Sequence, residues 1–117
     1  MQDFKDPVAW QKGMALCRAV YEVTGRFPRG EAFGLTSQAR RAAVSIPSNI
    51  AEGRARDTRR DYRHFVHLAR GSACELETQL LLSVDLGFVS RPEADPILVS
   101  IAELQRILNG LIRSLTD

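Results

Sequence analysis

The sequence predicts an all-α protein, an antiparallel up-down-up-down four-helix bundle that forms a single domain over residues 1–117. A chain of this length matches the usual size of one domain, roughly 100–150 residues. Apolar residues recur at helical spacing in four segments, which glycine and proline separate. No segment alternates polar and apolar residues for long enough to predict a strand. The connections are short, so successive helices are expected to run in opposite directions.

The first helix is expected to begin at Asp6-Pro7, because aspartate caps helix N-termini and proline fits the first helical position. Gly25 and Pro28 are expected to end it. Its apolar residues at helical spacing form the predicted core stripe, which consists of Trp10, Met14, Cys17, Val20 and Tyr21.

The second helix is expected to run from Gly34 or Leu35 to Arg54, with Pro47 inside it. One face carries the predicted core residues Leu35, Ala39, Ala42, Ala43, Ile46 and Ile50. Because proline has no N–H, Pro47 removes one helical hydrogen bond at a cost of about 3 kcal/mol and frees the carbonyl of Ala43. Either the helix continues with a kink and a neighbour or water satisfies this carbonyl, or the segment divides into two shorter helices.

The third helix is expected to run from an N-cap at Thr58, with Asp61 three residues later, to Asp85, with Gly87 as its stop. Its predicted core residues are Tyr62, Phe65, Val66, Ala69, Ala73, Leu76, Leu80 and Val84. The fourth helix is expected to begin at Asp95-Pro96. Its apolar residues follow alternating steps of four and three, as in helical bundles: Ile97, Ile101, Leu104, Leu108, Leu111 and Leu115.

Composition and motifs exclude several classes of protein. Cys17 and Cys74 form no C-x-x-C pair, which indicates free thiols in a reducing compartment. No apolar stretch reaches the roughly 18 residues of a membrane span, and no signal peptide is visible, so we expect a cytoplasmic protein without a membrane partner. His64 and His67 lack further metal ligands, and no catalytic or phosphate-binding motif is present. We therefore expect no enzyme activity, no cofactor and no small-molecule substrate.

Positive charge is concentrated in one part of the chain. The net charge is only +2, yet residues 40–70 carry eight arginines against three acidic residues. The third helix is expected to place its basic residues along one side, a surface that we call the arginine stripe: Arg59, Arg60, Arg63, His67 and Arg70. Like charges one turn apart repel each other, so the stripe does not stabilise the helix. The phosphates of RNA or DNA would explain it, and so would salt bridges to acidic residues.

The second helix has too few charges for a solvated surface. Ten uncharged residues lie between Arg41 and Glu52. The face opposite the core carries the small hydroxyl residues Ser45 and Ser48, which permit another backbone to come close. In the third helix, residues 80–82 are three consecutive leucines that cannot all face one core. We therefore predict a homo-oligomer whose interface includes Arg41, Ser45, Ser48, Glu52 and Leu81.

Residues 33–53 have the sequence FGLTSQARRAAVSIPSNIAEG, with Trp10 and Tyr21 upstream and a Leu-Gly-Phe turn at residues 86–88. This pattern resembles the signature of the four-helix-bundle proteins named after the 23S rRNA intervening sequence. The resemblance covers nearly the whole chain, and it implies a bacterial, cytoplasmic bundle that assembles as a homopentamer. A similar bundle, the accessory variability protein of diversity-generating retroelements, is a more basic pentamer that binds nucleic acid.

Two functions are compatible with these observations. In the first, the protein is a non-catalytic homo-oligomeric scaffold that binds RNA or DNA through the arginine stripe. In the second, it is a protein–protein assembly module without a nucleic-acid role, and its arginines form salt bridges between subunits. The surroundings of Arg59, Arg63 and Arg70 in the assembly distinguish the two.

Overall fold

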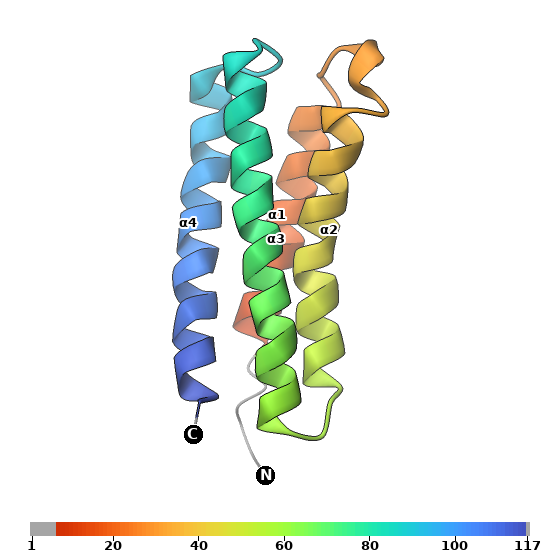
Figure 1. The fold of residues 1–117 in the computed structure, drawn as a ribbon. Coiled ribbons are helices and arrows are strands. Elements are labelled where there is room, and N and C mark those ends of the chain that lie inside the picture. The colour runs from red at the N-terminus through yellow and green to blue at the C-terminus, as the bar shows by residue number, and fades with distance from the viewer. Residues whose placement is uncertain (1–6, 117) are drawn as a thin grey trace.

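The computed structural model describes residues 7–116, which form four α-helices and one short 3-10 helix. In chain order these are α1 (Val8–Thr24), η1 (Arg29–Glu31), α2 (Leu35–Arg54), α3 (Arg59–Asp85) and α4 (Arg91–Ser114). Figure 1 shows the four α-helices packed lengthwise into one bundle, with the chain reversing direction from each helix to the next. No strand occurs within residues 7–116. The predicted all-α four-helix bundle is therefore confirmed.

Contacts between neighbouring helices follow the antiparallel order. Residues that come later in α3 contact residues that come earlier in α4: Arg59 contacts Ser114, Arg70 contacts Asn109, and Cys74 contacts Gln105. In the same way, ion pairs to α4 join Lys12 of α1 to Glu103, and Arg26, just after α1, to Glu93. No helix in the described part of the chain combines the length and apolarity that crossing a bilayer requires.

The predicted limits of α3 are confirmed. The Oγ1 atom of Thr58 accepts a hydrogen bond from the backbone N–H of Asp61 at 3.1 Å, as an N-cap does. At the other end Gly87 has a φ of +80°, a conformation that favours glycine. The N–H of Gly87 then donates to the carbonyl of Val84, and the N–H of Phe88 donates to that of Ser83.

The predicted start of α4 is wrong, because the helix begins five residues earlier, with Ser90 as its cap and Arg91 as its first residue. Ser90 and Glu93 form a capping box, in which the Ser90 Oγ accepts from the Glu93 N–H and a Glu93 carboxylate oxygen accepts from the Ser90 N–H. Pro96 therefore lies inside the helix, near its first turns. The capping box gives hydrogen-bond acceptors to two backbone N–H groups, those of Ser90 and Glu93. An aspartate cap before a proline would serve fewer of these groups.

The predicted core stripe of α1 is displaced by one residue. The helix buries Ala9, Gly13, Leu16 and Val20, whereas of the expected stripe only Val20 is fully buried. Trp10, Met14 and Cys17 are half-buried, and Tyr21 is 46% exposed. Small residues at positions 9 and 13 let α2 come close: a Cβ on Gly13 would lie 3.4 Å from side-chain atoms of Ile46 and Pro47. The expected cap residue Asp6 lies outside the described residues.

Pro47 is accommodated in a continuous α2, so the alternative of two shorter helices is wrong. The carbonyl of Ala43, which Pro47 cannot serve, accepts a hydrogen bond from the Cys17 thiol of α1 at 3.0 Å. Burial raises the pKa of this thiol, against the charge of Arg18, and so favours the protonated form that donates. A neighbouring helix thus replaces the missing donor.

The remaining core predictions hold almost throughout. All six predicted core residues of α2 are buried. In α3 the exceptions are Phe65 and Val84, which are half-buried, and in α4 the exception is Leu111. Ile112 is buried beside it.

Candidate assembly and nucleic-acid surfaces

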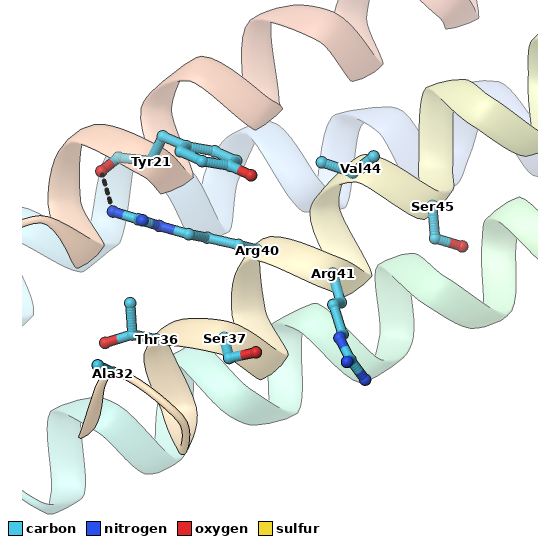
Figure 2. A pocket seen from close by; sticks show the side chains of 8 residues that line it. All are labelled: Tyr21, Ala32, Thr36, Ser37, Arg40, Arg41, Val44 and Ser45. Atoms are coloured by element: carbon cyan, nitrogen blue, oxygen red, sulfur yellow. Dashed lines mark hydrogen bonds between the residues drawn. The ribbon is translucent and has the colours of Figure 1, made fainter. Parts of the chain in front are cut away.

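An open groove follows the outer side of α1 and α2. Its upper part, which we call the arginine hollow, encloses about 530 Å³ and is lined by Tyr21, Ala32, Thr36, Ser37, Arg40, Arg41, Val44 and Ser45 (Figure 2). Its lower part, which we call the apolar hollow, encloses about 310 Å³ and is lined by Trp10, Met14, Cys17, Val44, Pro47, Ser48 and Ala51. Val44 lines both parts, so they form one continuous surface.

Arg40 fixes the upper end of α2 to α1. Its Nε atom donates to the Oγ1 of the buried Thr24 at 2.9 Å, and its Nη2 donates to the carbonyl of Tyr21 at 3.3 Å. The guanidinium also lies 4.5 Å from the centre of the Tyr21 ring. Figure 2 shows Arg40 directed toward Tyr21, whereas Arg41 is directed away from it. Arg40 is therefore held in place by its own chain.

Arg41 is exposed and lies between two hollows. Besides the arginine hollow it lines a second space of about 390 Å³ between α2 and α3, together with Gln38, Ala42, Ser45 and Glu75. None of the ion pairs within residues 7–116 includes Arg41. Its charge faces solvent on the side of the bundle that carries the groove.

The structure brings only part of the predicted interface together. Ser48 is exposed on α2 like Arg41, and Glu52 is exposed in an ion pair with Arg56 at 3.1 Å. Ser45 is half-buried, because its Oγ lies 2.7 Å from the Ser72 Oγ of α3. Ser45 therefore belongs to the contact between α2 and α3 within one chain.

Leu81 lies on another side of the molecule. It follows Cys74 by two helical turns, and the Cys74 Sγ accepts a hydrogen bond from the Gln105 side chain of α4 at 3.3 Å. This places Leu81, which is 39% exposed, on the flank of α3 that faces α4. The α2 residues and Leu81 do not form one patch.

Sequence reasoning missed the apolar hollow, because it assigned Trp10, Met14 and Cys17 to the core. The sequence also holds a second set of apolar residues at helical spacing, each one position earlier: Ala9, Gly13 and Leu16. This set forms the core face of α1. Ranking residues by size favours the wrong series, since the small residues are the ones that permit close helix packing. The groove thus carries large apolar side chains at the surface.

The arginine stripe lies along the edge between α3 and α4 and contacts neutral oxygens of α4. Arg59 donates to the carbonyl of Ser114, Arg63 donates to the Oγ1 of Thr116 at 3.3 Å, and Arg70 donates to the Oδ1 of Asn109 at 2.9 Å. Cationic groups near a helix C-terminus favour its negative dipole end. Two of these arginines thus stabilise the last turn of α4.

The remaining members of the stripe are exposed. Arg60 is exposed on the solvent side of α3. The Nδ1 of His67 lies 3.2 Å from a guanidinium nitrogen of Arg70. A small loss of hydration around the exposed ring, and then the charges of Arg70 and Arg63, hold the pKa of His67 below its usual value. The charge of the stripe at neutral pH is therefore carried by its arginines.

The described residues present no metal-binding group of three or more histidine, cysteine, aspartate or glutamate side chains. The groove and the stripe instead offer two kinds of contact. The first is an apolar contact in the groove, and the second is attraction of anions along the stripe.

Comparisons with known proteins agree with this fold. No curated protein matches the sequence. A crystal structure at 1.70 Å resolution of a protein of unknown function from the S23 ribosomal protein family of Bacteroides thetaiotaomicron VPI-5482 is similar, with a TM-score of 0.80 and 21% sequence identity over 89% of this chain and 97% of that chain. At this identity the likeness concerns the fold. The model of the family described as 23S rRNA-intervening sequence protein matches residues 5–110. The chain therefore belongs to the 23S rRNA-intervening sequence protein family.

Proposed function

We propose that the protein is a non-catalytic helical scaffold that assembles with copies of itself through the groove on α1 and α2. The apolar hollow carries the proposal, because it leaves Trp10, Met14 and Pro47 around an open space at the surface. Apolar surface of this kind is typical of protein interfaces, and tryptophan is among the residues that contribute most to binding.

The neighbouring surface of α2 supports the same role. Ser48 lies within the apolar hollow, and Ser37 lies within the arginine hollow next to it. At these two positions the short side chains let a partner helix approach the backbone of α2 closely. The resemblance of the sequence implies five subunits, and we adopt this number for the proposed assembly. A ring requires a head-to-tail interface that closes on itself.

Multi-angle light scattering tests the assembly. A pentamer gives about five times the 13.0 kDa mass of the chain. Ser48→Glu places a carboxylate in the apolar hollow and should reduce the mass toward that of one chain, while the helical circular dichroism stays unchanged. Ser100→Glu on α4 is the matched control, because Ser100 is exposed and lies outside the groove. A wild-type mass of one chain at micromolar concentration refutes the proposal.

A second candidate function is binding of RNA or DNA along the arginine stripe. The arginines of the stripe have hydrogen-bond donors to spare. A guanidinium carries five N–H donors, whereas Arg63 makes one hydrogen bond and Arg70 makes two contacts, one to Asn109 and one to His67. The oxygens of Thr116 and Asn109 that accept from Arg63 and Arg70 are neutral, so these two guanidinium groups keep their positive charge for a phosphate. An assembly would repeat the stripe in every subunit, and binding would be independent of base sequence.

Because Arg59 and Arg63 also hold the end of α4, a variant that removes them has two effects. We therefore compare two triple variants at Arg59, Arg63 and Arg70. Replacement by lysine keeps the charge and should retain most nucleic-acid affinity, whereas replacement by glutamine should lower both the affinity and its salt dependence. Each lost phosphate contact reduces the slope of log K against log salt by about 0.9 for duplex DNA and about 0.7 for single strands.

Gel retardation and fluorescence anisotropy at about 50 mM salt measure the affinity, and anisotropy titrations at several higher salt concentrations give the slope. Arg91→Gln removes one charge at the opposite end of the bundle and serves as the control for net charge. Equal affinity of the lysine and glutamine variants contradicts binding through the stripe. If the glutamine variant dissociates the oligomer, these arginines act in subunit contacts, as the assembly-module alternative predicts.

A further inference from the structure

Phe33 is the most exposed large apolar residue among residues 7–116, with 98% of its surface accessible, and the next is Val99 with 67%. It lies between η1 and α2, in the segment that joins α1 to α2 at the upper end of the bundle in Figure 1. Single exposed apolar residues are common, but an aromatic ring in full contact with water is unfavourable. Phe33 therefore has a large amount of apolar surface to bury.

The turn that carries Phe33 is well braced. The Oε1 of Glu31 accepts a hydrogen bond from the N–H of Leu35 at 3.0 Å, and the N–H of Gly34 donates to the carbonyl of Glu31 at 2.9 Å. A Cβ on Gly34 would lie only 2.7 Å from that same Oε1, so a side chain at position 34 would displace the Glu31 carboxylate from this cap. The ring is thus presented from a fixed backbone, which lowers the entropy lost on binding.

The apolar hollow has the size and lining that an aromatic side chain needs. Its volume of about 310 Å³ is near the lower end of ligand pockets, about 300 Å³. Trp10 and Met14 offer an aromatic and a thioether surface, both of which pack favourably against a ring. Ser48 is its only polar side chain other than the Cys17 thiol.

We propose that Phe33 of one copy inserts into the apolar hollow of a second copy. This inference rests on the proposed self-assembly and names the contact that drives it. Phe33 and Pro47 are fourteen residues apart, and α2 rises 1.5 Å per residue, so they lie about 20 Å apart along the helix. A chain cannot place its ring in its own hollow, and the contact joins two copies.

Charges beside the two surfaces are complementary. Glu31 precedes Phe33 by two residues, and only one of its carboxylate oxygens caps α2. Arg41 lines the adjoining arginine hollow, one turn before Val44, which lines both hollows. It is in none of the ion pairs of the described chain. An acidic group beside the ring thus meets a basic group beside the hollow.

The first experiment replaces Phe33 by serine and uses Val99→Ser on α4 as the matched control. Because Phe33 makes so little contact within its own chain, Phe33→Ser should leave the helical circular dichroism unchanged. It should weaken self-association about 10- to 100-fold, the effect of losing one buried aromatic side chain. Trp10 is the only tryptophan and lines the hollow, so its emission should move to longer wavelength as the hollow fills with water. Val99→Ser should change neither quantity.

The second experiment uses the native thiols as reporters. In Phe33→Cys, mild oxidation should join the introduced thiol to Cys17 of another copy, because Cys17 lines the hollow. Cys74 is an internal competitor, since it is exposed on α3 whereas Cys17 is half-buried. Peptide mass spectrometry identifies the pairs. A predominant link from position 33 to Cys17 supports the proposal, and predominant links to Cys74 or to position 33 of another copy overturn it.

The outcomes separate this inference from the proposed function. If Phe33→Ser stays fully assembled with unchanged Trp10 emission, the insertion of Phe33 is refuted while self-assembly stands. If the wild-type chain is a monomer at micromolar concentration, both fail together.

Discussion

The hydrogen bond between the Cys17 thiol and the Ala43 carbonyl predicts an energetic coupling between Cys17 and Pro47. Pro47 removes the backbone donor that normally serves this carbonyl, and the thiol replaces it at 3.0 Å. Cys17→Ala removes the replacement and leaves a carbonyl of a fully buried residue without a donor. Pro47→Ala restores an N–H at position 47, so in that background the thiol is no longer needed.

The magnitudes follow from these contacts. An unsatisfied buried carbonyl costs about 1–3 kcal/mol, and the lost sulfur costs about 1 kcal/mol of packing. In the wild-type background Cys17→Ala should therefore destabilise by about 2–4 kcal/mol. In the Pro47→Ala background only the packing loss remains, about 1 kcal/mol. The coupling energy should be about 1–3 kcal/mol.

The four proteins of this double-mutant cycle are the wild type, Cys17→Ala, Pro47→Ala and the double variant. Urea unfolding measures the free energy of unfolding of each. Protein concentration is held constant, because association shifts apparent stability. Cys17→Ser is the control, since its hydroxyl can still donate to Ala43 and should cost less than Cys17→Ala. Additivity within about 0.5 kcal/mol would refute the reasoning, because it would mean that the thiol does not compensate for the proline.

Two further predictions concern helix packing and capping. Gly53→Ala should lower the free energy of unfolding by about 1–3 kcal/mol in thermal unfolding, because its Cβ would lie 2.8 Å from Tyr62 Cδ1; an unchanged melting temperature would contradict this close packing. Ser90→Ala should cost about 1 kcal/mol at neutral pH by removing the cap of α4. Hydrogen bonds from Ser90 lower the pKa of Glu93, so the stabilisation is present above the ordinary glutamate pKa and is lost as the pH falls through the lowered value. The cost of Ser90→Ala should therefore be smaller at about pH 2–3, and an equal cost at both pH values would contradict it.

Helix limits and core residues could be predicted from the sequence wherever a segment carried a single cap or a single apolar face. The Thr58 cap and Gly87 define α3 in the sequence, and the structure uses both. The six core residues of α2 were predictable as well, since a single apolar face repeats along the helix. The freed carbonyl of Ala43 was also predictable, because it follows from the chemistry of proline alone. Its donor was not, since the thiol comes from a different helix.

The errors occurred where two patterns competed. In α1, the large residues Trp10 and Met14 and the small residues Ala9 and Gly13 both follow helical spacing, and only the approach of α2 selects the small ones. At α4, the Asp95-Pro96 signal competed with the reciprocal cap at Ser90, five residues earlier. The direction of the arginine stripe depends on which helix packs beside α3, and one sequence does not contain that information. The predicted interface and nucleic-acid residues stay predictions that the experiments above test.

The contact between Cys17 and Ala43 also determines which alignment of α1 on α2 is stable. Most core positions of a bundle hold aliphatic side chains, which accept a neighbour shifted by one turn, about 5.4 Å. A shift of α1 by one turn would leave the Ala43 carbonyl without its thiol and would place a larger residue than Gly13 against Pro47. Both changes are unfavourable, so a proline in one helix excludes slipped arrangements of the helix beside it.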